Sequence, residues 1–251
     1  MRDKFKLGVT LFTIGLLGVL TLLQLNFPIE KLSKAALDRF SIQELKILML
    51  VNPSILLLIA VLTGVNLSRK VELGAPLIEK LLKIKNTTII FKEQLKIGVI
   101  IGSSIGILTS FITLLFKSFF SLNFHKLTSE IEPPFLMKIG YGGITEELLI
   151  RYGFMTFIVW VIFKTSKKLN DYTYWFGIIL SSIFFAIGHF PIVFSSVHNP
   201  STSLLIYIFS GNFIAGLTFG WLYWKKGLEA AFIGHIFAHI IMTALAFFFH
   251  L

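Results

Sequence analysis

The sequence predicts an all-α polytopic membrane protein with about seven transmembrane helices and additional interfacial amphipathic helices. Of the 251 residues, 55% are hydrophobic and 14% are charged, whereas soluble domains carry about 25% charged residues. The mean hydropathy is +0.82, and apolar stretches of membrane-spanning length recur along the chain. These values exclude a water-soluble fold. The chain has no cysteine, which excludes disulfides, thiolate metal sites and cysteine nucleophiles.

The apolar stretches are each close to the length of about 20 residues that crosses a bilayer. The first follows basic residues, but it is too long for a signal peptide and no cleavage site follows it, so we expect a retained helix. The fourth is unusually long and contains charged residues, and the fifth is short. The expected spans are Leu7–Leu25, Leu48–Leu67, Ile97–Phe116, Phe135–Phe163, Tyr174–Phe190, Ser203–Trp224 and Leu228–Phe249.

Two connecting segments, Ile29–Ile47 and Pro76–Ile84, mix apolar and charged residues at helical spacing. In the second segment we expect an apolar face, with Glu79 beside or opposite it. Such segments either lie flat on the membrane or form short polar connectors. We divide the single integral membrane domain into N-terminal helices and loops, residues 1–134, and a membrane core, residues 135–251.

The formal net charge is +10, and the positions of the basic residues indicate its role. With the N-terminus in the cytoplasm, the cytoplasmic loops hold most of the loop lysines and arginines, as the positive-inside rule requires. No basic groove or base-stacking motif is present. We therefore expect contact with the lipid bilayer and none with nucleic acid. Four tryptophans fall at span ends on the cytoplasmic side: Trp160, Trp175, Trp221 and Trp224.

The fourth span contains two adjacent carboxylates and an arginine, Glu146, Glu147 and Arg151. An ionisable group in hydrocarbon is costly unless it is paired or faces water. On a helix, Glu147 and Arg151 lie on one face and can pair, whereas Glu146 points about 100° away from Glu147. We expect Arg151 to neutralise Glu147 and to leave Glu146 facing a cavity as a general base. A purely structural triad between helices is the alternative.

Histidines lie in two other spans. His189 follows Phe185 by four residues at the end of the fifth span, where a lone histidine is more often an interfacial residue than a catalyst. His235 and His239 lie on one face of the seventh span, at a spacing that suits two metal ligands or two helix–helix contacts. The zinc-protease motif H-E-x-x-H is not matched, because Ile236 follows His235.

The depths of these residues in the membrane set a constraint on the fold. Glu146 lies about a third of the way in from the outside, and His235 lies nearer the inside end of its span. One site therefore needs kinked or offset helices, or a seventh helix that starts deep in a water-filled cavity. Room for an irregular start of the fourth helix comes from Gly142, Gly143, Pro133 and Pro134.

The order E-E-x-x-x-R, F-x-x-x-H and H-x-x-x-H, each on a separate apolar helix, resembles the CPBP family. These proteins are also called Abi or CAAX-protease-like, and they are related to the type II CAAX prenyl endopeptidases. The resemblance covers about half of the chain, and it departs from the family at His239, where the family has Asn. The residues that match the family motifs are Glu146, Glu147, Arg151, Phe185, His189 and His235.

The resemblance implies an intramembrane endopeptidase in a bacterial cell membrane, which cleaves a membrane-embedded or lipid-tethered peptide. In one family scheme Glu146 activates a water that His189 positions, and His235 and His239 hold the oxyanion. In an older scheme Glu146, His189 and His235 bind a catalytic zinc ion. Glu147 supports the site in both schemes. The alternative is a non-catalytic protein, such as a bacteriocin-immunity or partner-binding factor or a transporter.

Overall fold

The computed structural model describes residues 1–25, 39–86, 88, 90–117 and 133–249, and every regular element within these ranges is helical. Within the described ranges, seven helical stretches are long and apolar enough to cross a membrane, which confirms the all-α polytopic fold. In chain order the spans are α1 and η1 (Arg2–Leu20, Thr21–Gln24), α3 and η3 (Ile42–Leu67, Ser68–Val71), α5 (Phe91–Lys117), α7, η4, η5 and α8 (Phe135–Met137, Lys138–Glu146, Leu148–Met155, Thr156–Ser166), α9 and α10 (Asp171–Ile187, Phe190–Ser196), α11 (Thr202–Lys226) and α12 (Leu228–Phe249).

Three of these helices begin at a polar side chain that caps them. Ser41 precedes α3, Asn170 precedes α9 and Ser201 precedes α11, and each side-chain oxygen accepts a hydrogen bond from a backbone N–H three residues on. Such caps satisfy donors that the first helical turn leaves unpaired. The helix that carries Phe185 therefore starts at a position fixed by the local sequence.

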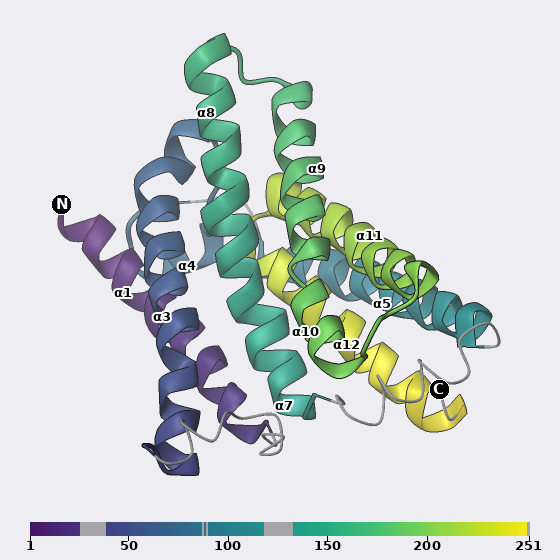
Figure 1. The fold of residues 1–251 in the computed structure, drawn as a ribbon. Coiled ribbons are helices and arrows are strands. Elements are labelled where there is room, and N and C mark those ends of the chain that lie inside the picture. The colour runs from purple at the N-terminus through teal and green to yellow at the C-terminus, as the bar shows by residue number, and fades with distance from the viewer. Residues whose placement is uncertain (26–38, 87, 89, 118–132, 250–251) are drawn as a thin grey trace.

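The fourth span, from α7 to α8, lies between two groups of helices (Figure 1). Helices α1 and α3 pack on one side of it, and α9, α11 and α12 pack on the other. Gly18 of α1 lies directly against the carbonyl of Gly140, and Gly64 of α3 lies against the ring of Tyr152. These contacts leave no room for a side chain at Gly18 or Gly64. The backbones of α1 and α3 therefore lie directly against the fourth span on this side.

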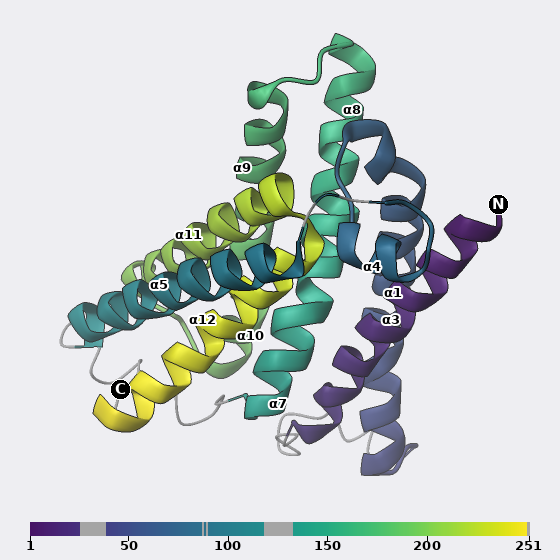
Figure 2. The same cartoon turned by 180° about the vertical axis from the view of Figure 1, so that it is seen from behind.

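Helices α5, α11 and α12 are inclined steeply to the fourth span, as Figures 1 and 2 show from opposite sides. A helix that crosses its neighbour at a steep angle meets it at one place rather than along its whole length. The inclination therefore brings the start of α12 to the middle of the fourth span. This agrees with the prediction that offset helices are needed to unite the motifs.

Glycines on α5 allow its backbone to approach that of α12. Gly98, Gly102 and Gly106 are spaced four residues apart, and each faces a backbone carbonyl of α12. The carbonyls belong to Ala230, Gly234 and Ala238. Small residues at this spacing are a common means of close helix packing in membranes. Helix α5 thus supports the turn of α12 that carries the two histidines.

The middle of the fourth span is wound as a π-helix rather than an α-helix. The π-helical elements η4 and η5 adjoin at Glu147. π-Helical turns, with hydrogen bonds between residues five apart, are rare and occur frequently at functional sites. Gly142 and Gly143 lie within η4, as expected for a fourth helix that starts irregularly.

The segment predicted as an amphipathic helix at Pro76–Ile84 differs from the expected pattern. It forms the short helix α4 (Pro76–Leu81), in which Glu79 is 3% exposed and Leu81 is 72% exposed. Arg69 pairs with Glu79 at 3.0 Å, and Glu229 of α12 accepts a hydrogen bond from the backbone N–H of Ile78 at 2.8 Å. These polar contacts, rather than an apolar face, hold α4 in place. Of the other predicted segment, residues 29–38 lie outside the described residues, and α3 begins at Ile42.

Candidate active site

Glu147 is the centre of a buried polar cluster between the fourth span and α12. Its Oε2 accepts a hydrogen bond from Arg151 Nε at 3.2 Å, and its Oε1 accepts one from His235 Nδ1 at 2.9 Å. The side chains of Glu147 and Arg151 are both 0% exposed. The predicted pairing of Arg151 with Glu147 is confirmed. His235 is a further partner of Glu147 that the sequence did not predict.

The guanidinium of Arg151 also contacts α9. Its Nη1 donates to Ser181 Oγ at 3.3 Å, and its central carbon lies 5.4 Å from the ring centre of Phe185. Its Nη2 has no hydrogen-bond partner among the described residues. Arg151 therefore connects Glu147 with the helix that leads to His189.

His189 lies at the junction of α9 and α10, immediately before the first residue of α10. Its Nδ1 is 2.8 Å from the carbonyl oxygen of Phe185. A carbonyl oxygen only accepts, so Nδ1 carries the proton, and Nε2 of the neutral ring is left as an acceptor. The ring of Phe185 packs edge-on against the imidazole, with centres 4.8 Å apart. The F-x-x-x-H spacing thus fixes both the position and the tautomer of this histidine.

His235 and His239 project from the same face of α12, as predicted, and their rings stack with centres 4.9 Å apart. Phe219 of α11 also stacks on His235, at 4.5 Å between centres. Gly142 of η4 faces the ring nitrogens, because a Cβ there would lie 2.9 Å from His239 Nε2 and 3.9 Å from His235 Nε2. Because Gly142 has no side chain, the backbone of η4 packs directly against the ring of His239.

Glu146 has a different environment from the adjacent Glu147. Its side chain is only partly buried, and it makes no hydrogen bond or ion pair with any residue that the structure describes. It is near enough to Arg151 and Tyr141 for electrostatic interaction with both. Because Arg151 is bonded to Glu147, the carboxylate of Glu146 is left available for another partner.

The chain was compared with known families, curated proteins and solved structures. Residues 130–241 match the model of the family described as type II CAAX prenyl endopeptidase Rce1-like. This part of the chain is similar to that family, and we call it the Rce1-like region. No curated protein and no solved structure matches the chain. The match confirms the family resemblance inferred from the motifs, and it supports an intramembrane endopeptidase of CAAX type in general. The motif residues that it contains are Glu146, Glu147, Arg151, Phe185, His189, His235 and His239.

The Rce1-like region does not gather a ligand set for zinc. In the part of the chain that the structure describes, no three histidine, aspartate or glutamate side chains are placed to hold one metal ion. Glu146 bonds to neither His189 nor His235, and Oε1 of Glu147 is held by His235. In this arrangement the predicted ligands Glu146, His189 and His235 do not fit a shared metal ion.

Sequence reasoning missed three contributors to the Rce1-like site. Ser181 lies four residues before Phe185, so that S-x-x-x-F-x-x-x-H forms one stripe of α9. Phe219 stacks on His235, and a lone aromatic residue in an apolar helix gives no signal of such a role. The glycines of α5 carried a usable signal, because small residues four apart are typical of close helix contacts.

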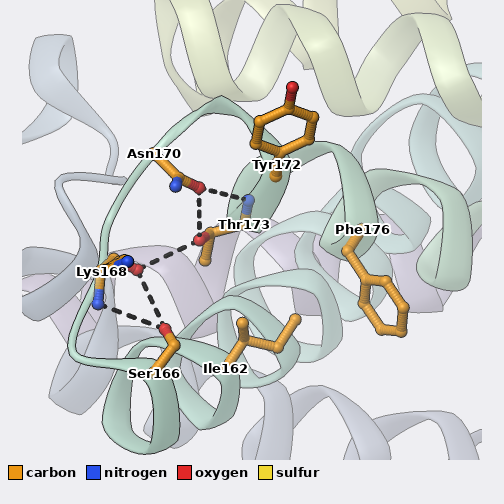
Figure 3. A pocket seen from close by; sticks show the side chains of 7 residues that line it. All are labelled: Ile162, Ser166, Lys168, Asn170, Tyr172, Thr173 and Phe176. Atoms are coloured by element: carbon orange, nitrogen blue, oxygen red, sulfur yellow. Dashed lines mark hydrogen bonds between the residues drawn. The ribbon is translucent and has the colours of Figure 1, made fainter.

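A separate pocket lies outside this site, at the turn that joins α8 and α9 (Figure 3). Its volume is about 360 Å³, and Ile162 and Phe176 form apolar parts of its wall. Asn170 Oδ1 and the hydroxyl of Thr173 bond to each other at 3.0 Å at its rim. The pocket contains none of the motif residues of the Rce1-like region, and we therefore take the Glu147 cluster as the candidate site.

Proposed function

We propose that this protein is an intramembrane endopeptidase that hydrolyses a peptide bond in a membrane-embedded or membrane-tethered substrate. The observation that carries the proposal is the contrast between two adjacent carboxylates within the endopeptidase-like region. Glu147 is bonded to Arg151 and His235, whereas Glu146 has no hydrogen bond or ion pair among the described residues. A carboxylate with no fixed partner is suited to accept a proton from water.

In the proposed reaction, a water molecule gives one proton to Glu146 while its oxygen attacks the carbonyl carbon of the scissile bond. His189 orients this water through Nε2, since its Nδ1 proton is bonded to Phe185. Collapse of the tetrahedral intermediate breaks the C–N bond, and the proton on Glu146 passes to the leaving nitrogen. The products are a carboxylic acid and an amine, and transfer of the remaining water proton turns them into a carboxylate and an ammonium group.

The oxygen of the attacked carbonyl becomes negatively charged and needs hydrogen-bond donors. We assign this role to Nε2 of His235 and His239, which both lie next to Gly142 of η4. Nδ1 of His235 already donates to Glu147, so His235 carries protons on both nitrogens when it donates from Nε2, with Glu147 as its counter-ion. Neither ring nitrogen of His239 has a hydrogen-bond partner among the described residues, which leaves Nε2 free to carry its proton.

We further propose that the N-terminus lies in the cytoplasm of a bacterial cell. Lys70 and Lys164 both lie over the ring of Trp160, at 5.9 and 5.0 Å from its centre, and Lys225 lies 3.3 Å from that of Trp224. Tryptophan with lysine is typical of the cytoplasmic membrane interface. In this orientation the core at residues 135–251 carries the chemistry, and residues 1–134 support it.

The proposal is tested with Glu146→Gln, which keeps the size of the side chain and removes its charge. Membrane peptides from cells with the wild-type or the variant protein are compared by mass spectrometry. We expect an uncut substrate to accumulate in the variant, while the variant still inserts into the membrane. Glu93→Gln, a change at an exposed carboxylate of α5, is the control. The same peptides in both strains would refute the proposal.

The zinc scheme is tested on the cleaved peptide once it is identified. Because the predicted ligands are not gathered around one point, we expect cleavage by the purified protein to continue after treatment with a chelator. Loss of cleavage that added zinc restores would instead favour the metal scheme.

A further inference from the structure

We propose that Ser181 is a positioning residue of the site: it orients the guanidinium of Arg151 and, through it, the Glu147–His235 pair. The inference deepens the proposed function and rests on it for its effect on catalysis. The hydroxyl of Ser181 would not touch the substrate, because it is buried behind Arg151.

Ser181 belongs to the same stripe of α9 as the second motif. It lies four residues before Phe185, which itself lies four residues before His189. Residues at this spacing share one face of a helix. Along this stripe, the hydroxyl bonds to Arg151, the ring of Phe185 lies against the guanidinium, and the carbonyl of Phe185 holds His189.

The direction of each hydrogen bond at Ser181 follows from its partners. Its hydroxyl donates to the carbonyl of Ile178 at 3.1 Å, so the oxygen is left to accept from Arg151 Nη1 at 3.3 Å. A guanidinium can only donate. Both side chains are 0% exposed, and a buried charge depends on every partner that it has.

Arg151 has few such partners. Nε donates to Glu147 and Nη1 donates to Ser181, while Nη2 has no hydrogen-bond partner among the described residues. One bond at Nε would leave the planar group free to turn about that contact. The second bond, at the opposite end of the group, and the ring of Phe185 together fix its plane. This orientation in turn fixes the carboxylate oxygen that accepts from His235.

The neighbouring Ser182 provides a matched control. It is also 0% exposed, and its hydroxyl donates to the same carbonyl of Ile178, at 2.6 Å. It lies against Gly216 of α11 and makes no bond to Arg151. Ser181→Ala and Ser182→Ala therefore each remove a hydroxyl that donates to the carbonyl of Ile178. Only Ser181→Ala also removes a hydrogen-bond partner of Arg151.

The first measurement does not depend on catalysis. Thermal unfolding in detergent is followed for Ser181→Ala, Arg151→Lys and the double variant, and for the same cycle with Ser182→Ala. We expect the stability losses caused by Ser181→Ala and Arg151→Lys to be non-additive in the double variant, because the two residues share one hydrogen bond. The stability losses caused by Ser182→Ala and Arg151→Lys should add. Additive shifts for Ser181 and Arg151 would overturn the proposed contact.

The second measurement is the hydrogen-bonded Nδ1 proton of His235, observed by NMR and assigned with a His235→Gln variant. Its resonance should move in Ser181→Ala and keep its position in Ser182→Ala. If the serines only contribute packing, the resonance would move in both variants or in neither. Either result would overturn the positioning role.

The third measurement is the cleavage of the peptide identified with Glu146→Gln. We expect Ser181→Ala to lower kcat about tenfold with little change in KM, since a small displacement of a reacting group is costly, and Ser182→Ala to cleave like the wild type. Equal cleavage by both variants would overturn the catalytic part of the inference. If the wild type cleaves nothing, the proposed function fails, and the unfolding cycle and the His235 resonance still decide whether Ser181 positions Arg151.

Discussion

Gly142 has no side chain, and this lets the backbone of η4 pack against the imidazole of His239. A Cβ at Gly142 would lie 2.9 Å from His239 Nε2, which is closer than two such atoms approach without a shift of one of them. In the proposed reaction this nitrogen donates a hydrogen bond to the oxygen of the attacked carbonyl. A side chain at this position would therefore displace one of the two proposed oxyanion donors.

We expect Gly142→Ala to lower cleavage by at least about tenfold, because the added methyl group displaces the ring of His239 from the position in which its Nε2 donates to the oxyanion. The measurement is the rate of cleavage in detergent, together with thermal unfolding. Gly211→Ala is the control, since a Cβ at Gly211 meets no atom within 4 Å. An active Gly142→Ala enzyme would show that His239 does not hold the oxyanion.

The residue scale also shows what the sequence could predict of the site. The pairing of Glu147 with Arg151 was predictable, because the two residues are four apart on one helix. The bond from His235 to Glu147 was not, because 88 residues separate them and their meeting depends on the tilt of α12. Spacing within a helix is a local property, whereas contacts between helices depend on the whole fold.

At the scale of elements, α5 acts as a support for α12. The carbonyls that face its glycines flank His235 and His239 along α12. A displacement of α5 would therefore move both histidines relative to the fourth span. The family match begins at residue 130 and does not include the first three predicted spans, yet the third of them, α5, packs directly against the helix that carries the two histidines.

We expect Gly102→Val to destabilise the protein by about 1–3 kcal/mol, the usual cost of overpacking, because a Cβ on Gly102 would overlap the carbonyl of Gly234. Thermal unfolding in detergent measures the change. Gly8→Ala provides the control, since its Cβ would meet only Val65, at an ordinary 3.8 Å. Equal stability of the two variants would mean that α5 and α12 are not packed this closely.

The seven spans themselves were predictable, because apolar length depends on composition alone. The burial of Glu79 in α4 was not, since its partner Arg69 belongs to the preceding span and its helix is held by Glu229 of α12. An acidic residue between leucines suggests an exposed position until its partners are known. The π-helical winding of the fourth span likewise has no sequence pattern as plain as apolar length.

At the scale of the whole molecule, the orientation in the membrane can be tested directly, because the chain has no cysteine. We expect a single cysteine in place of Ser166, the last residue of α8, to react with a membrane-impermeant thiol reagent only from the cytoplasmic side. A cysteine at Ser201, before α11, should react only from the outside. The opposite result at both positions would reverse the proposed topology.

The π winding of the fourth span has a consequence for its length. The span from Phe135 to Ser166 has 32 residues, and an α-helix of that length would measure about 48 Å, against about 30 Å of hydrocarbon. A π-helix packs more residues into each turn, with hydrogen bonds between residues five apart. The winding of η4 and η5 therefore makes this span shorter than an α-helix of 32 residues, and so closer to the thickness of a bilayer.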